Sequence, residues 1–168
     1  MNKTTLLISE GTREISNILA EIEEIVIPEG VERIGDYAFQ NCSSLSEITI
    51  PYSVMSIGNF AFYNCSSLTE IIIPDSVTCI GDHAFQNCSY LSEITIPDSV
   101  TSIGNLAFCG CSSLTEITIP NSIAEIKLYA FASCSSLESI YIDKEKDSLD
   151  PIYIGIPETT KIYWKGEF

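Results

Sequence analysis

Five glutamates recur at a constant interval of 23 residues along this chain of 168 residues. They are Glu24, Glu47, Glu70, Glu93 and Glu116. Carboxylates that a fold brings side by side can share a hard cation such as calcium, act as general acids and bases, or attract a partner that presents lysine or arginine. Which of these chemistries applies depends on the secondary-structure elements that carry the glutamates. The residues that form those elements recur at the same interval of 23.

The interval belongs to a repeat that covers most of the chain. A proline, a phenylalanine and a cysteine each return with the same period, as Pro28, Pro51, Pro74, Pro97 and Pro120, Phe39, Phe62, Phe85, Phe108 and Phe131, and Cys42, Cys65, Cys88, Cys111 and Cys134. A fixed period of this length is typical of solenoids, in which one unit buries its apolar edge only by stacking on its neighbours.

The copy at residues 45–67 shows what each unit is expected to form. Ile48 and Ile50 alternate with Thr49, which predicts a short strand with one buried face. Pro51 lacks an N–H group, so the strand should end there. Parallel strands of successive copies would then stack at about 4.8 Å.

The second half of the same copy predicts a return path. Ile57 indicates a second short extended piece, and Gly58 predicts a turn with a positive φ angle. We expect a short helical turn to follow and to carry Phe62 into the interior.

Both ends of the chain depart from the repeat. Apolar residues at helical spacing predict an amphipathic helix over residues 12–23, after a first strand at residues 4–8. Residues 152–156 and 162–164 predict closing strands. The expected fold is a single domain of the α/β solenoid class, largely β, with short parallel strands. Its parts are an N-terminal cap at 1–24, a solenoid of five to six rungs at 25–142 and a C-terminal cap at 143–168.

The charge distribution narrows the classes of partner. The formal net charge is −15, and no lysine or arginine occurs between residues 34 and 126. Phosphate backbones and anionic membranes need cationic partners, so the sequence argues against nucleic acid and favours a protein partner with a basic surface. No apolar run has the length of a membrane span or a secretory leader. We therefore expect a monomer without membrane insertion that is cytoplasmic by default, with a secreted or cell-surface location as the alternative.

The cysteines and the single histidine are expected to have structural roles rather than catalytic or metal-binding ones. The five repeat cysteines should form a ladder of buried thiols, while Cys79 and Cys109 lie off the ladder and should be more exposed, which fits a reducing compartment. A zinc site is not expected because His83 is the only histidine. No Ser/His/Asp set and no phosphate-binding loop can be assembled, so we predict no catalytic residue, cofactor or metal ligand.

Over residues 22–142 the copies resemble the BspA-like class of leucine-rich repeats, whose 23-residue units have the form LTEITIPDSVTSIGDHAFQNCSS. Two departures stand out: serine or Gly30 fills the position of the usual asparagine, and Lys127 replaces the glycine of the last full copy. The resemblance implies a right-handed superhelix. It also implies a non-enzymatic binding protein, since many members act in adhesion at bacterial or protist surfaces.

Two outward strand positions are the candidate binding surface. One carries the five glutamates, called here the Glu strip, and its neighbour carries the Thr strip, which comprises Thr49, Ile72, Thr95, Thr118 and Tyr141. Like charges on adjacent strands repel. The Glu strip therefore either serves a basic partner or was copied with the repeat and is screened by water and ions.

A second variable column contains Tyr37, Phe60, His83, Leu106 and Tyr129. It forms either an exposed contact strip or oligomer interface, or packing between adjacent turns. Three functions follow from the sequence: a protein-binding module, which leads, a calcium-stabilised cell-surface adhesion module, and, remotely, an enzyme.

Overall fold

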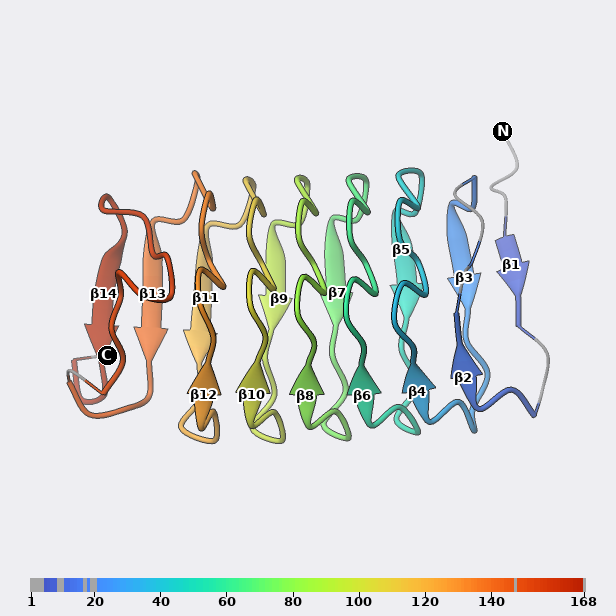
Figure 1. Ribbon diagram of the computed structural model, residues 1–168, viewed down its shortest axis with the longest axis horizontal. Helices are drawn as coiled ribbons and strands as arrows, with labels where there is room; N and C mark the ends of the chain where they lie inside the picture. Colours follow the sequence, from blue (N-terminus) through green and yellow to red (C-terminus); the bar gives the residue numbers. More distant parts are fainter. Residues whose placement is uncertain (1–4, 9–10, 17, 19–20, 147, 168) are drawn as a thin grey trace.

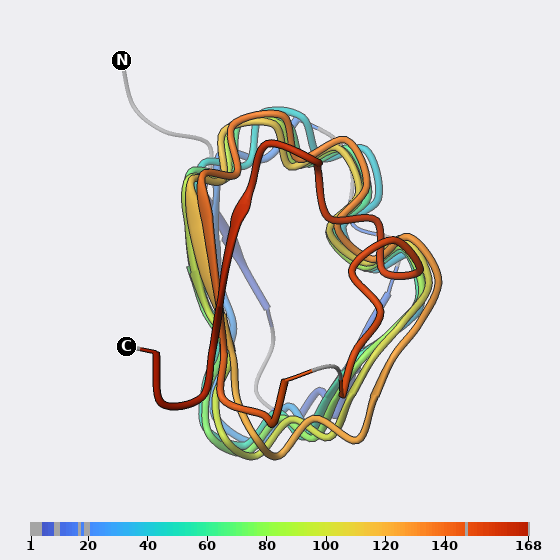
Figure 2. The ribbon, with the colours of Figure 1, turned by 90° about the vertical axis from the view of Figure 1, so that its left-hand side faces the viewer.

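The computed structural model describes residues 5–8, 11–16, 18, 21–146 and 148–167. In this part of the chain, short strands alternate between two rows that run along the long axis of the molecule (Figure 1). Viewed down that axis, successive rungs superpose as one closed outline that surrounds the core (Figure 2). The fold is therefore a largely β solenoid with parallel strands, as the repeat predicts.

The first row contains the strands that carry the Glu and Thr strips, and its outer surface is called the strand face below. Its members are β1 (Thr5–Leu7), β3 (Glu24–Val26), β5 (Glu47–Thr49), β7 (Glu70–Ile72), β9 (Glu93–Thr95), β11 (Glu116–Ile119), β13 (Ser139–Ile142) and β14 (Lys161–Trp164).

The second row contains the shorter return strands. They are β2 (Glu14–Ile15), β4 (Arg33–Ile34), β6 (Ser56–Ile57), β8 (Cys79–Ile80), β10 (Ser102–Ile103) and β12 (Glu125–Ile126). These six strands pair in one continuous parallel sheet, whereas the first row divides into the groups β1-β3-β5, β7-β9 and β11-β13-β14.

A spine of phenylalanine rings fills the centre of the stack. Phe39, Phe62, Phe85, Phe108 and Phe131 are fully buried. Successive ring centroids lie 5.1, 5.1, 5.4 and 5.5 Å apart, and the last four rings are nearly parallel. One residue type at one repeat position therefore packs on itself in every rung, which explains why the sequence keeps it unchanged.

The repeat glycines serve a different purpose from the one that the sequence suggests. Gly35, Gly58, Gly81 and Gly104 do not have positive φ angles. A Cβ atom added at Gly81 would lie 2.6 Å from the carbonyl carbon of Gly58 and 2.7 Å from the nitrogen of Asn59. The glycines are required because consecutive backbones approach closely there, and the prediction of a positive φ at Gly58 was wrong.

Positive φ angles occur instead a few residues later in each turn. Phe60 has a φ of 56° and Asn64 a φ of 58°, and the other described copies repeat the pattern. Two left-handed residues this close together interrupt the φ, ψ pattern of an α-helix. The segment that carries Phe62 is consequently a series of turns rather than the expected helical turn.

The predicted N-terminal helix over residues 12–23 was also wrong. The described residues of this segment contain β2 and turns but no helix, and residues 17, 19 and 20 lie outside the described part. Thr5 pairs with Glu24 at an offset of 19 residues, whereas Glu24 pairs with Glu47 at 23. The segment is therefore a rung shortened by four residues, and its buried Ile15 pairs with Ile34 of the next rung.

The C-terminal segment closes the stack with one strand and a turn. β14 pairs in parallel with β13, and Trp164 is buried at its end. Residues 151–155 form turns instead of the predicted strand, and they place Ile154 in the core. Asp150 Oδ1 accepts the backbone N–H of Ile152 at 2.9 Å, which is a local turn bond that an extended chain could not make.

We expect Gly81→Ala to lower the free energy of unfolding by about 3 kcal/mol, because its Cβ would meet fixed backbone atoms of the preceding rung. The matched change Gly30→Ala adds a Cβ in open space at a φ of +96° and should cost only about 1 kcal/mol. Urea unfolding measures both. An equal or smaller loss for Gly81→Ala would contradict the close-approach explanation.

Candidate functional site

The strand face carries the predicted surface on short strands whose side chains alternate in and out. Glu70 and Ile72 are exposed, and Ile71 between them is buried. The same alternation occurs in β9 and β11. It brings the Glu strip and the Thr strip into two parallel rows, because the register pairs Glu24 with Glu47 and Glu70 with Glu93.

The strand face opens at two intervals. Within residues 21–146, all of which are described, no ladder joins β5 to β7 or β9 to β11. A groove of about 560 Å³ lies between β5 and β7, and one of about 670 Å³ lies between β9 and β11. The paired interval between β3 and β5 forms a hollow of only about 280 Å³. The two unpaired intervals therefore hold larger grooves than this paired one.

The two grooves share their glutamates and differ in their other walls. The groove between β5 and β7, called groove A, combines Glu47 and Glu70 with the exposed apolar side chains of Tyr52 and Ile72. Groove A can therefore receive both a positive charge and an apolar group.

The groove between β9 and β11, called groove B, is more acidic. It combines Glu93 and Glu116 with Asp98 and Asp143, and Lys165 Nζ lies 3.8 Å from Asp143 Oδ1 at its edge. Such a groove suits a positively charged side chain.

The ends of both strips differ from their middle. The hydroxyl of Thr5 donates a hydrogen bond of 3.0 Å to Glu24 Oε2, so the first glutamate has a partner on β1. Tyr141 is only partly exposed and stacks on Tyr163, with ring centroids 5.1 Å apart. The middle rungs, where the grooves lie, present the more exposed members of the predicted surface.

A polar ladder beside the glycines was not recognised from the sequence. Asp36, Asn59, Asp82 and Asn105 follow the four glycines, and each side-chain Oδ1 of the first three accepts the backbone N–H of the next rung at 2.7 to 2.8 Å. The amide of Asn105 also donates to Asp82 Oδ2 at 3.1 Å. The strict alternation of aspartate and asparagine is the sequence signal for this ladder, since it avoids carboxylates on adjacent rungs.

Serines occupy the position of the usual leucine-rich asparagine and perform a similar bonding role. The hydroxyls of Ser53, Ser76 and Ser99 donate to a valine carbonyl of the preceding rung at 2.6 to 2.7 Å. These bonds tie consecutive rungs together at the turn after the first-row strand.

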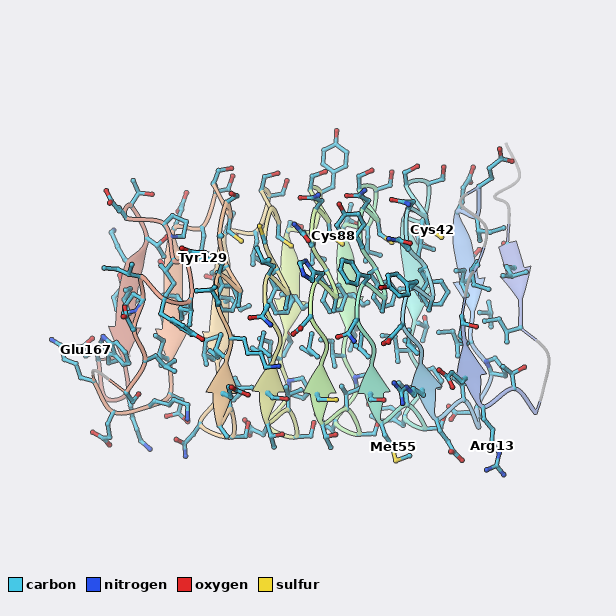
Figure 3. All side chains as sticks on the ribbon, in the orientation of Figure 1. Arg13, Cys42, Met55, Cys88, Tyr129 and Glu167 are labelled. Atoms are coloured by element: carbon cyan, nitrogen blue, oxygen red, sulfur yellow. The ribbon has the colours of Figure 1, made fainter. Side chains whose placement is uncertain are left out.

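The variable column packs between turns and remains partly exposed. The rings of Tyr37 and Phe60 stack at 5.1 Å, and those of Phe60 and His83 stack at 4.3 Å. Tyr129, at the other end of the column, is 48% exposed and lies in the turns that follow β12 (Figure 3). Ring stacking between adjacent turns, one of the two alternatives, is confirmed for the first three members.

The cysteine ladder is buried, as predicted. Cys42, Cys65, Cys88, Cys111 and Cys134 are fully buried, and Cys42 and Cys88 lie at the same level of their rungs (Figure 3). The thiol of Cys88 donates to the carbonyl of Phe62 at 3.1 Å. Desolvation by burial raises the pKa of Cys42 to about 11 and that of Cys134 to about 12. Cys79 and Cys109 are less buried than the ladder, as the sequence indicates.

The described residues hold no group of three or more His, Cys, Asp or Glu side chains that could bind a metal ion. His83 Nδ1 lies 2.6 Å from Gln86 Oε1, and its ring stacks on Phe60. In the same part of the chain, no helix is long and apolar enough to cross a membrane.

Comparison with known families decides the assignment of the repeat. The family model for the BspA type leucine rich repeat region matches residues 16–138 with six copies. The chain belongs to the BspA-type leucine-rich repeat family. Proteins with this repeat are generally interaction modules, and their solenoids are generally binding scaffolds without enzymatic activity.

Solved structures with similar folds include several bacterial leucine-rich repeat proteins. The T. pallidum leucine rich repeat protein TpLRR is 37% identical over 71% of this chain and 58% of its own, with a TM-score of 0.69. A leucine-rich repeat protein from Bacteroides ovatus is 30% identical over 89% of this chain and 49% of its own, with a TM-score of 0.55. A comparison with curated proteins gave no match.

A leucine rich cell surface protein from Faecalibacterium prausnitzii shares the fold at 24% identity, a TM-score of 0.67 and coverage of 96% of this chain and 60% of its own. The chain thus spans about half to three fifths of the length of these structures. At 24% identity this likeness shows the fold alone, and the comparisons do not support the cytoplasmic default.

We expect the buried thiols to make the fold sensitive to alkali. Burial holds the pKa of Cys88 well above its ordinary value of 9.0, so the thiolate forms only in the unfolded chain. The stabilisation is fully present below about pH 9 and is lost above it, by about 1.4 kcal/mol per pH unit for each such thiol. Urea unfolding of the wild type between pH 7 and 10.5 should show this decline.

The control is Cys88→Ala, which lowers stability at every pH through lost packing but removes one titrating thiol. Its free energy of unfolding should fall less steeply above pH 9 than that of the wild type. Parallel curves for the two proteins would contradict the assignment.

Proposed function

We propose that the protein is a non-enzymatic protein-binding module, and that the strand face binds a partner with a basic surface. The observation that carries the proposal is the coincidence of the Glu strip with the two grooves. Glu47 and Glu70 line groove A, and Glu93 and Glu116 line groove B. Groove A lies entirely within residues 34–126, which contain no lysine or arginine, and groove B does so except for Asp143, which has Lys165 beside it.

Electrostatics supports a cationic partner. Glutamates on adjacent parallel strands repel each other. Glu47 and Glu70 line groove A together, Glu93 and Glu116 line groove B together, and the register pairs Glu24 with Glu47 and Glu70 with Glu93. A lysine or arginine between two such carboxylates removes the repulsion and adds attraction. Because these side chains are exposed, each pair contributes only about 0.2–1 kcal/mol, and the main effects are on association rate and on specificity.

The shape of the face supports protein rather than a small molecule as the ligand. The grooves are shallow openings in a row of short strands, and the exposed Thr49, Ile72 and Thr95 lie beside the Glu strip. A rigid solenoid offers a long surface of this kind without an enclosed pocket. We extend the proposal to the cell surface as the location, by analogy with the homologue described above.

The direct test changes Glu47, Glu70 and Glu93 together to Gln. Binding partners captured by the intact chain and identified by mass spectrometry should bind the triple variant about tenfold more weakly, since several exposed ion pairs total roughly 1.4 kcal/mol. Unfolding stability should stay equal or rise, because like charges have been removed. Binding of the wild type should also weaken as salt rises from 50 to 300 mM.

A matched control carries the same charge change elsewhere. Asp75→Asn, Glu125→Gln and Glu158→Gln alter exposed carboxylates that lie outside the Glu strip. This control should retain binding. Unchanged partner binding by the strip variant, together with raised stability, would overturn the proposal and leave repeat duplication as the origin of the Glu strip.

A further inference from the structure

The two grooves repeat at an interval of two rungs, and this interval restricts which basic segments can fill both. Groove A contains Glu47 and groove B contains Glu93, which stand two 23-residue units apart. Between these rungs the phenylalanine spine advances by 5.1 and then 5.4 Å. The grooves are therefore about 10.5 Å apart along the solenoid axis, close to two parallel-strand spacings.

A chain that runs along this axis must present cations on one side at the same interval. In a β-strand, side chains on one side repeat at about 6.8 Å or, at twice that spacing, about 13.6 Å, and neither value fits. A polyproline-II segment has three residues per turn and rises about 3.1 Å per residue, so every third side chain returns to the same side after about 9.3 Å. This repeat is about 1.2 Å shorter than the groove interval, which a flexible lysine or arginine side chain can span.

An α-helix with cations seven residues apart reaches about 10.5 Å and matches the interval more closely, so spacing alone does not select the polyproline-II segment. The other walls of groove A favour the proline-rich segment. Tyr52 is 75% exposed and Ile72 is 69% exposed, and both line the groove together with Pro74. Exposed aromatic and apolar side chains beside a groove are the usual docking surface for the prolines of such segments.

We propose that the strand face binds a polyproline-II segment that carries a lysine or arginine at every third residue. The segment runs along the solenoid axis, with one cation in groove A between Glu47 and Glu70 and the next in groove B between Glu93 and Glu116. Its prolines pack on Tyr52 and Ile72. This inference rests on the proposed function, since it specifies the chemistry and spacing of the basic partner at the same surface.

The test uses proline-rich synthetic peptides of equal length and composition, each with two lysines. The lysines stand three residues apart in the first peptide, two apart in the second and four apart in the third, and an alanine-rich helical peptide carries them seven apart. Titrations of the full chain, followed by amide NMR shifts, give the affinities. The first peptide should bind about fivefold more tightly than the second and third, because one more exposed cation contributes about 1 kcal/mol.

Two double variants test whether the lysines of the peptide bind in the two grooves. Glu47→Gln with Glu70→Gln removes the charges of groove A, and Glu93→Gln with Glu116→Gln removes those of groove B. Either pair should abolish the preference for the three-residue spacing. Tyr52→Ala should weaken all proline-rich peptides while leaving the helical peptide unaffected.

Three outcomes would overturn the inference. Equal affinity of the three proline-rich peptides, with all of them weakened by the glutamate variants, would refute the spacing and leave the basic-partner function standing. Tighter binding of the helical peptide would replace the proline-rich segment by a helix. Affinities that do not respond to either glutamate variant would refute the spacing and the proposed function together.

Discussion

Five consecutive rungs of this solenoid stack their phenylalanine rings, and at Gly35, Gly58, Gly81 and Gly104 the neighbouring rung approaches so closely that an added Cβ would clash. This contact sets the distance between rungs, and the hydrogen bonds between rungs span the same distance. The cysteine thiols reach the carbonyls of the preceding rung, as Cys88 does with Phe62, and the serine hydroxyls do so at another corner. A change that moved one rung would have to disturb all of these bonds together.

The outward strand positions are free of this constraint, and the surface chemistry varies there. Ile72 replaces a threonine in the middle of the Thr strip without any change in the buried Ile71 beside it. The continuous second sheet, β12 to β2, holds the rungs together, so the first row can open at two intervals without loss of the stack. The grooves therefore form in the first row, and the continuous pairing of the second row keeps the rungs stacked.

The sequence predicts the repeated core well, because a position such as Phe62 or Cys65 has the same neighbours in every copy. The sequence predicts the role of a residue less well where the same residue type can serve two different structural roles. Gly58 could signal a positive φ or a close approach, and only the position of Gly35 on the preceding rung decides between them. The N-terminal rung was mistaken for a helix because it is four residues shorter, which hides Ile15 from the 23-residue alignment.

The outward direction of the Glu strip could also be predicted, from the alternation around Ile48 and its counterparts. The two grooves could not. Each interval of the strip places a glutamate opposite a glutamate, and nothing in the copies distinguishes the paired interval of Glu70 and Glu93 from the open interval of Glu47 and Glu70. Which intervals open depends on the whole row, and a single unit of sequence does not contain that information.

Because the second row is paired continuously and the first row is not, the molecule should bend more easily in one direction than in the others. The second-row strands β2 to β12 pair without a break, whereas the first row consists of three blocks separated by two unpaired intervals. Bending about the continuously paired side would change the width of these intervals, so the width of each groove depends on the local curvature of the stack.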